Sequence, residues 1–336
     1  MSKFEDILNN INPEEKHPND RVLLIDGLNI FLRAFAVNGS LNEKGVPVGG
    51  ITGFMKSLAF AIREMEPTRV IVTYDGAGGS KRRRKINPKY KANRTPKRVT
   101  KFDAFNSLED EKEAMKIQFR RLLSYLELLP IDVYSVDNVE ADDVIAYLAQ
   151  NVLENEVIIM SADQDFLQLV STKTSVYSPT KKKIYKPKDV LEQFGVTATN
   201  YINYKILLGD KSDNVPGVSG LGPVKLVKLF PELTGENKVT LEDMITKSAE
   251  LINENKLYLS VVERRHQLFI NQQLMNLEGD FLSPDNRLLV KQAFTECYEL
   301  NKYLFHQIYV NDRLGESIPN VDNWLTEVFG YLNSLN

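Results

Sequence analysis

Nine carboxylates recur in short motifs along the sequence, and three of them stand within four residues. Glu140, Asp142 and Asp143 lie in the stretch VEADDVIAYLAQ. Glu140 and Asp143 are three residues apart, so a helix that starts here brings both to one face. The helix dipole favours each negative charge by only about 0.3–1 kcal/mol. The other six acids are Asp26, Asp75, Asp163, Asp165, Asp210 and Asp213.

Such a set of acids points to hard metal ions. Oxygen ligands without cysteine or histidine select Mg²⁺, for which Mn²⁺ can substitute. Two ions roughly 3.5–4 Å apart stabilise the attacking and leaving oxygens of an in-line phosphodiester displacement. The only histidines, His17, His266 and His306, are far apart, which argues against a histidine-based metal site or triad. We therefore expect two Mg²⁺ ions to offset the repulsion between the acids.

Each acidic motif also has a plainer interpretation when it is taken alone. EADD is a short acidic helix start, SADQD can be a turn, and an acid after one strand can be a helix cap. GDKSDN resembles part of a calcium loop, but it lacks the spacing and the closing Glu of an EF-hand. The order of the motifs along the chain, each after a predicted strand or at a helix start, favours one shared site.

The elements that would position these acids are strands alternating with helices. Apolar runs predict strands at Arg21–Asp26, Thr68–Asp75, 131–136 and from Asn155 onward, and TSVYSPTKKKIYK predicts a hairpin. This alternation is typical of an α/β fold with a central, mostly parallel sheet flanked by helices. Ligands of such sheets bind beyond the carboxyl ends of the strands, where Asp26, Asp75 and Asp163 fall.

A run of positive charge follows the second strand. The segment Lys81–Lys101 contains eleven Lys or Arg residues, and no acid occurs from Gly76 to Phe102. A charge run is usually a solvated surface. Next to an acidic site, however, it suits a phosphate backbone, so we favour nucleic-acid binding. Pro88 and Pro96 predict an arch or loop at about 78–102 rather than one continuous helix.

Composition limits the remaining possibilities. The chain has 336 residues, is 43% hydrophobic and 26% charged, and carries a net charge of −3. These values are ordinary for a globular protein. No apolar run approaches the ~18 residues of a membrane span, and the single cysteine, Cys297, fits a reducing cytoplasm. We expect a cytoplasmic protein, monomeric and without a membrane partner.

The extent of the strand pattern predicts the domain organisation. Residues 1–20 are expected to form a polar extension and 21–186 an α/β domain that contains the basic arch or loop. Residues 187–336 are expected to be a helical C-terminal domain, because the strand pattern stops at about residue 187. Its first unit, at about 209–230, contains GDKSDNVPGVSGLGPVKLVKLF.

Taken together, the motifs resemble those of the 5′-nuclease family. The stretches that carry the resemblance are LLIDGLNIFLRAF, VTYDGAGGSKRRRKINPKYKANR, VEADDVIAYLA, IIMSADQDFLQL and GDKSDNVPGVSGLG. The family includes flap endonucleases, phage 5′-exonucleases and the 5′→3′ exonuclease domain of bacterial DNA polymerase I. Within it, the segment from SADQDF and the helical tail are most similar to the ribonuclease H of T-even phages. The sequence departs from that enzyme at VPGVSGLGPVKLVKLF, which resembles the helix–three-turn–helix of other members.

The resemblance implies a PIN-like 5′-nuclease fold and a role for each acid. The acids that match those around the first ion are Asp26, Asp75, Glu140, Asp142 and Asp143. The acids that match those around the second ion are Asp163, Asp165, Asp210 and Asp213. Among them, Asp26, Asp75, Asp142 and Asp163 are the expected catalytic carboxylates.

The resemblance also implies the contacts to nucleic acid. Arg83 and Lys91 match residues that contact the scissile phosphate, and Arg94 closes the same motif. Arg33 is expected near the 5′ end of the substrate. The neighbouring cations of the basic run, expected to contact nucleic acid as well, are Arg82, Arg84 and Lys89.

The helix–three-turn–helix is expected to hold the duplex through its backbone. Gly217, Gly220 and Gly222 supply tight turns that let a phosphate approach, and Lys225 is the expected phosphate contact. In the family this element also coordinates K⁺. Two aromatic residues, Phe31 and Phe35, have two open interpretations: stacking on a base or packing in the core.

The expected function is thus a Mg²⁺-dependent 5′→3′ exonuclease and flap endonuclease. Its substrates would be DNA duplexes and RNA–DNA hybrids with 5′ ends or flaps, and its role the removal of RNA primers in phage replication. A replication single-strand-binding protein is a partner that only the resemblance implies. The alternatives are a protein that binds forked DNA without cutting it, and a host exonuclease of the polymerase or replication-restart type.

Overall fold

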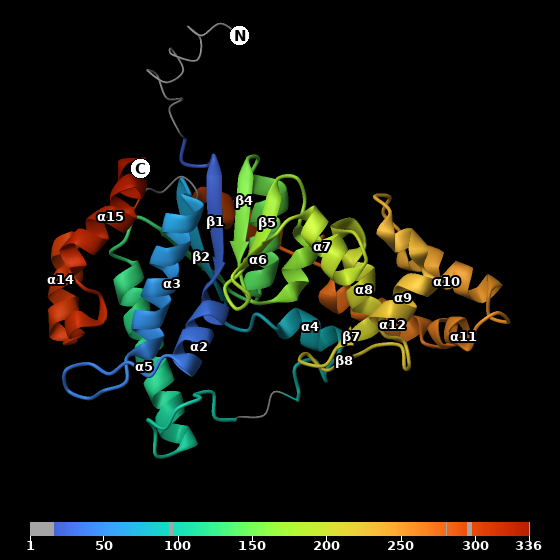
Figure 1. Cartoon of the computed structure of the whole chain (residues 1–336), viewed down its shortest axis with the longest axis horizontal. Coiled ribbons are helices and arrows are strands. Elements are labelled where there is room, and N and C mark those ends of the chain that lie inside the picture. The colour runs from blue at the N-terminus through green and yellow to red at the C-terminus, as the bar shows by residue number, and fades with distance from the viewer. Residues whose placement is uncertain (1–16, 94–96, 280, 294–297, 336) are drawn as a thin grey trace, which may run out of the picture.

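A six-stranded sheet forms the centre of the computed structural model, which describes residues 17–93, 97–279, 281–293 and 298–335 (Figure 1). The strand order is β3-β2-β1-β4-β5-β6, and only β6 runs antiparallel to its neighbour. The strands are β1 (Arg21–Asp26), β2 (Arg69–Asp75), β3 (Asp132–Val136), β4 (Glu156–Met160), β5 (Thr174–Ser178) and β6 (Lys183–Tyr185). The expected α/β class with a mostly parallel sheet is confirmed.

The apolar runs form strands because both faces of the sheet are covered. In β1, Val22 to Ile25 are almost fully buried, which is usual for a parallel strand between two helical layers. The chain enters a helix directly after β1, so Asp26 ends the strand and caps that helix. Asp75 is the last residue of β2, and Asp163 follows β4 after two residues. Since β1 pairs with both β2 and β4, these three acids share one edge of the sheet.

Two hydrophobic cores lie on opposite faces of the sheet. One contains Leu23 and Ile25 and is covered by α2, α3, α5, α14 and α15. The bounds of these helices are α2 (Gly27–Val37), α3 (Gly49–Met65), α5 (Leu108–Leu126), α14 (Lys302–Asn311) and α15 (Val321–Ser334). The other core contains Val22 and Leu24 and extends into the helices that follow the sheet.

The second side also has a layer of helices, and Asp142, Asp143 and Lys225 lie on two of them, α6 and α9. The helices on this side are α6 (Ala141–Tyr147), α7 (Pro187–Phe194), α8 (Tyr201–Leu208), α9 (Pro223–Leu229), α10 (Leu241–Glu250), α11 (Lys256–Glu263), α12 (Arg265–Met275) and α13 (Pro284–Ala293). A π-helical turn (Leu148–Val152) extends α6, and short 3-10 helices occur at Gln164–Leu169, Ala198–Asn200, Pro231–Thr234 and Gly315–Ser317. No described helix is both long and apolar enough to cross a bilayer.

One detail of the C-terminal half differs from the prediction. Strand pairing does not stop at about residue 187, because β7 (Gly209–Asp210) pairs with β8 (Val215–Pro216). These strands are two residues long, too short for an alternating pattern to be visible in the sequence. They lie between α8 and α9. The segment predicted as a helical unit at about 209–230 therefore contains the connection and α9, and the helix before the connection is α8, which ends at Leu208.

The basic segment starts as a helix and does not continue as one. Helix α4 (Lys81–Ile86) ends before Pro88, whose ring is incompatible with a helix interior. Beyond it, the described residues up to 102 form turns and irregular structure. Figure 1 shows α4 beyond the strand ends, between α2 and the group formed by α8, α9 and α12. Arg94 and residues 1–16, which include most of the expected N-terminal extension, lie outside the described residues.

Candidate active site

Asp26 lies at the centre of the acidic edge. Its side chain is held by the backbone N–H of Asn29 at 3.2 Å and by the hydroxyl of Ser161 at 3.0 Å. The residue is only 7% exposed, and this burial raises its pKa to about 7. The negative charges of Asp163 and Asp75 raise the pKa further, since like charges disfavour ionisation. The three acids therefore interact across the end of the sheet.

Asp142 faces the same region from helix α6. Burial raises its pKa well above the usual range, and the charges of Asp26 and Asp163 are the next causes. Asp75 helps to place this helix, because its Oδ1 accepts a hydrogen bond from the backbone N–H of Ala141 at 2.8 Å. Four of the predicted catalytic acids thus come together from β1, β2, α6 and the loop after β4.

Glu140 and Asp143 are neutralised by side chains of the basic segment. Arg83 donates hydrogen bonds to both carboxylates, and the three side chains are at most 3% exposed. The ammonium of Lys91 donates to Glu140 at 3.0 Å. Burial acts to raise the pKa of Glu140, but the charges of Arg83 and Lys91 outweigh it and lower that pKa. Arg83 and Lys91 therefore offset part of the repulsion in the VEADD motif, at Glu140 and Asp143.

A second ionic cluster joins Asp165 and Asp210. The ammonium of Lys205, on α8, lies 2.8 Å from Oδ1 of Asp165 and 2.7 Å from Oδ2 of Asp210. Burial and then the charge of Asp163 raise the pKa of Asp165 to about 7. Burial also acts against the ionisation of Asp210, but Lys205 and Ser212 outweigh it and lower the pKa of Asp210 to about 2.

The segment around YKANR and the GDKSDN motif are held together by hydrogen bonds to backbone carbonyls. The N–H of Lys91 donates to the carbonyl of Asp213 at 2.9 Å, with Lys91 at a φ of 56°. The side chain of Asn93 donates to the carbonyl of Lys211 at 2.7 Å, and that of Asn214 donates to the carbonyl of Lys89 at 2.9 Å. These contacts bring Asp213 to the same end of the site as Lys91.

The remaining predicted cations are spread over several elements. Arg33, on α2, donates to the hydroxyl of Thr180 in the β5–β6 hairpin. Arg82 lies beside Asp143 and stacks its guanidinium 3.9 Å from the ring centroid of Phe281. Arg84 and Lys89 are exposed to solvent.

The predicted glycine turns lie between α8 and α9. Gly220 has a φ of 76°, a left-handed conformation that glycine adopts readily. Gly217 packs against Leu208 so closely that an added Cβ would lie 2.2 Å from that backbone. Gly222 precedes α9, and the exposed Lys225 donates to the carbonyl of Gly220 at 3.1 Å.

Phe31 and Phe35 belong to the core. They are 1% and 2% exposed, and their rings pack against Phe119 and Phe105, respectively. Of the two interpretations that the sequence left open, core packing is the one that the structure supports.

The acids are not arranged as a ready-made metal site. In the described part of the chain, no three His, Cys, Asp or Glu side chains are grouped closely enough to hold an ion. The charges of these acids still affect one another, since Asp163 raises the pKa of both Asp26 and Asp142. The donor chemistry nevertheless fits a hard dication, because all the candidate ligands are carboxylate oxygens. Small movements of these side chains would be needed to enclose an ion.

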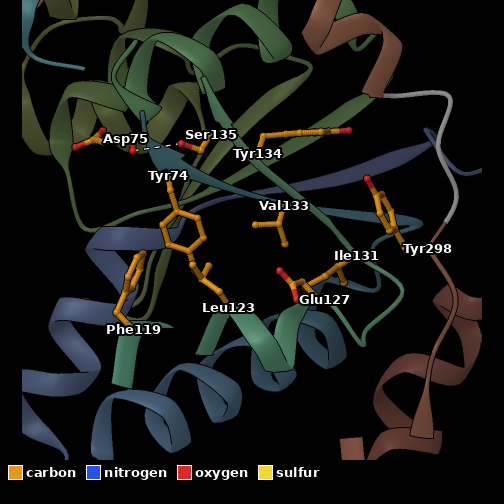
Figure 2. A pocket seen from close by; sticks show the side chains of 10 residues that line it. All are labelled: Tyr74, Asp75, Phe119, Leu123, Glu127, Ile131, Val133, Tyr134, Ser135 and Tyr298. Atoms are coloured by element: carbon orange, nitrogen blue, oxygen red, sulfur yellow. Dashed lines mark hydrogen bonds between the residues drawn. The ribbon is translucent and has the colours of Figure 1, made fainter. Parts of the chain in front are cut away.

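A separate, mostly apolar pocket of about 410 Å³ lies beside Asp75. Figure 2 shows that Tyr74, Phe119 and Leu123 line it, and that the carboxylate of Asp75 points away from these side chains. The hydroxyl of Ser135 donates to the backbone carbonyl of Asp75 at 3.4 Å. The pocket therefore shares Asp75 with the acidic edge but belongs to the opposite side of that residue.

Two contributors to the site were not predicted. Ser161 donates to Asp26, and Lys205 pairs with Asp165 and Asp210. Ser161 is the first residue of the SADQD motif, two positions before Asp163, so its position was a usable signal. Lys205 stands in an apolar helix five residues before Asp210, and nothing in that pattern reveals its partners.

The sheet, its acidic edge and the basic helix beside it define the fold of a 5′-nuclease. Residues 21–195 match the family described as the 5′-3′ exonuclease, N-terminal resolvase-like domain. The chain is 33% identical to a 5′-3′ exonuclease of Aquifex aeolicus over 210 residues. The aligned part makes up 62% of this chain and 68% of the relative. It is 32% identical over 224 residues to a 5′-3′ exonuclease of Bacillus subtilis, covering 64% and 71%. The chain belongs to the 5′-3′ exonuclease family, a family of nucleases, as its motifs predicted.

Longer relatives and solved structures extend the comparison. DNA polymerase I of Bacillus caldotenax is 32% identical over 270 residues, which are 77% of this chain but only 28% of the polymerase. The 5′-exonuclease of phage T5 with bound zinc has the same fold, with a TM-score of 0.61, 20% identity and coverage of 93% and 99%. A T5 flap endonuclease complex with DNA and metal ions gives the same four values.

Proposed function

We propose that the protein is a Mg²⁺-dependent 5′-nuclease that hydrolyses phosphodiester bonds near the 5′ ends of DNA duplexes, flaps and RNA–DNA hybrids. The observation that carries the proposal is the placement of Asp26, Asp142 and Asp163 at the same end of the sheet, from β1, α6 and the loop after β4. Such a concentration of negative charge next to a basic helix suits a phosphate substrate that is bridged to the acids by dications.

The proposed roles of the acids follow from their partners. Asp26, Asp75 and Asp142 are the side chains that would hold the first ion. Asp163, Asp165, Asp210 and Asp213 would hold the second. Glu140 and Asp143 contribute to the first group from a distance, since Arg83 and Lys91 already engage their oxygens. When bound, the ions would supply Lewis-acid stabilisation of the reacting phosphate and activate water.

Lys91 is the cation best placed to meet the scissile phosphate. Its side chain is partly exposed, and it reaches the acidic edge from a turn that is fixed to the Asp213 backbone. Arg83 is buried between two carboxylates, so its proposed role is to position the start of α6 and the neighbouring acids. Exposed Arg84 and Lys89, together with Arg33, Arg82 and Arg94, would contact the rest of the substrate backbone.

Further contacts are proposed for the unit between α8 and α9. The turns at Gly217, Gly220 and Gly222 allow a phosphate to approach the backbone, and Lys225 adds a positive charge. Contacts of this kind read the shape of a duplex rather than its sequence. A K⁺ ion at these turns, the division into a nuclease and a helical domain at about residue 187, and a monomeric state belong to the same proposal.

The finer role that we propose is removal of RNA primers, that is, a ribonuclease H activity on RNA–DNA hybrids. Relatives named 5′-3′ exonuclease and a T5 flap endonuclease complex with DNA support the general activity. The chain spans only about a quarter of the polymerases that it matches, so their activities are not transferred.

Product sizing on matched substrates tests the proposal. A 5′-RNA–DNA hybrid, the corresponding 5′-DNA duplex and a 5′-flap, each labelled at the 5′ end, are incubated with and without Mg²⁺. We expect short labelled products only when Mg²⁺ is present. Binding of all three substrates without any cleavage would instead identify a protein that recognises forked DNA but does not cut it.

A further inference from the structure

Lys205 occupies the space between two acids that the proposed second ion would need. Its ammonium lies 2.8 Å from Asp165 and 2.7 Å from Asp210, and its side chain is 12% exposed. The three residues come from different elements: the 3-10 helix after β4, α8 and β7. Burial acts to lower the pKa of Lys205, but the two carboxylates outweigh it and keep the group charged. The lysine is therefore a cation fixed between both acids.

A dication cannot bind these two oxygens while the ammonium stays in place. Mg²⁺ contacts its oxygen ligands at about 2.0–2.1 Å, closer than the ammonium stands to either carboxylate. An ion that bridged Asp165 and Asp210 would thus lie against the ammonium, and the two positive charges would repel each other strongly. One cation has to leave before the other can bind.

The first group of acids has no such resident cation. In the described ranges, no Lys or Arg forms an ion pair with Asp26, Asp75 or Asp142; Arg83 and Lys91 instead pair with Glu140 and Asp143. No cation is therefore fixed between the acids of the proposed first site in the way that Lys205 is fixed between Asp165 and Asp210. This difference predicts different affinities of the two sites for the same ion.

We propose that Lys205 is a built-in counter-cation that competes with the second divalent ion for Asp165 and Asp210. It makes the second site the weaker of the two, so that this site fills only at higher ion concentration. The inference rests on the proposed function, because it assumes that the acids bind divalent ions. Beyond the proposed function, Lys205 is assigned a role of its own: it lowers the occupancy of the second ion site and leaves that of the first site unchanged.

Titration with Mn²⁺, followed by electron paramagnetic resonance of the free ion, measures this difference on the full chain without nucleic acid. The variants are Lys205→Met, which removes the charge, and Lys205→Arg, which keeps it. Lys247→Met is the matched control, because Lys247 also forms a partly buried ion pair, 2.7 Å from Glu232, in a helix away from the acids. The readout is ion binding, so it does not depend on cleavage.

We expect one tighter and one weaker Mn²⁺ site in the wild-type protein, in Lys205→Arg and in Lys247→Met. In Lys205→Met the weaker dissociation constant should fall by about tenfold or more, because the competing charge is gone. Adding Asp210→Asn to Lys205→Met should abolish that gain, which assigns the tightened site to this acid.

Two outcomes would overturn the inference, and they differ in what else they affect. Two Mn²⁺ sites with unchanged or weaker affinity in Lys205→Met would exclude the competition but leave the proposed function intact. No Mn²⁺ binding by the wild-type protein would contradict both. Should Lys205→Met fail to fold without ions, Lys205→Gln offers hydrogen bonds to both carboxylates without the charge and must give the same tightening.

Discussion

Arg83 holds Asp143 through two hydrogen bonds, with its Nη2 2.7 Å from Oδ1 and its Nη1 2.9 Å from Oδ2. Both side chains are buried, and Arg83 also contacts Glu140 and donates to the backbone carbonyl of Leu274 at 2.8 Å. The contact joins α4 and α6 to the end of α12. A residue of the basic segment is thus part of the framework of the acidic site.

Replacing Arg83 should therefore destabilise the fold. Arg83→Met leaves two buried carboxylates without their main partner, and the loss of one member of a buried ion pair costs about 3–5 kcal/mol. Unfolding by urea measures the free energy. The control is Arg84→Met, at the exposed neighbouring position, which should change stability by less than ~0.5 kcal/mol. Equal effects of the two variants would mean that the buried ion pair does not stabilise the protein.

Gly209 should tolerate no side chain. Its φ of 74° lies in the region that glycine favours, and an added Cβ would stand 2.4 Å from the backbone nitrogen of Gly217. Gly209→Ala should cost ~2 kcal/mol or more in unfolding free energy. Gly222→Ala is the control, since nothing lies within 4 Å of its added Cβ, and it should cost less than ~1 kcal/mol. A similar loss of unfolding free energy in both variants would argue against the close packing of Gly209 against Gly217.

The stability of the ion-free protein should fall as the pH rises from about 4 to about 7. The pKa of Asp26 is raised in the folded state, mainly by burial and further by Asp163 and Asp75, so folding favours the protonated carboxyl. The unfolded chain releases this proton at lower pH, and each pKa unit of difference costs ~1.4 kcal/mol once the group ionises. Asp142 and Asp165, whose pKa values are also raised, act in the same direction.

Urea unfolding in the presence of a chelator, at about pH 5 and about pH 8, checks this pH dependence. The wild-type protein should be less stable at the higher pH, and Asp26→Asn should reduce the difference. If the difference in stability between the two pH values is unchanged in Asp26→Asn, the pKa of Asp26 is not raised by folding. Mg²⁺ added at the higher pH should restore stability to the wild-type protein more than to the variant, because the ion binds the ionised acids.

Charge on the exposed part of the basic segment should control the salt dependence of DNA binding. Lys89→Gln should weaken binding to all sequences alike and lower the slope of log affinity against log salt by about 1. Lys302→Gln, on α14 at the far side of the sheet, removes one charge away from the site and should leave the slope unchanged (Figure 1). Fluorescence anisotropy over a range of salt concentrations measures both. Identical slopes for Lys89→Gln and the wild-type protein would remove Lys89 from the interface.

Local patterns in the sequence were sufficient to predict the sheet and its acidic edge. The strands β1, β2 and β4 are largely apolar runs of five to seven residues, and an acid at or just after the end of each marks the edge where ligands bind. The start of α6 was predicted for the same reason, because VEADD combines acids with a following apolar face. These features depend on neighbouring residues, which a sequence displays directly.

Contacts between distant residues could not be predicted in this way. Arg83 and Glu140 are 57 positions apart, and nothing in the basic run distinguishes the buried Arg83 from the exposed Arg84 beside it. Lys205 meets Asp165 across 40 positions and only because α8 packs against the 3-10 helix that follows β4. The sequence therefore predicted which residue types form the site, but it did not predict which cations are bound to which acids.

The central claim is that acids from separate strands and α6 form one cation-dependent catalytic centre, and Asp142→Asn tests it most directly. Cleavage and binding of a 5′-labelled flap are measured in Mg²⁺ for the wild-type protein and the variant, with Asp285→Asn on α13 as a control. We predict that Asp142→Asn loses cleavage by at least about a thousandfold yet binds the flap within a few-fold of the wild-type protein. Undiminished cleavage by Asp142→Asn would contradict the account.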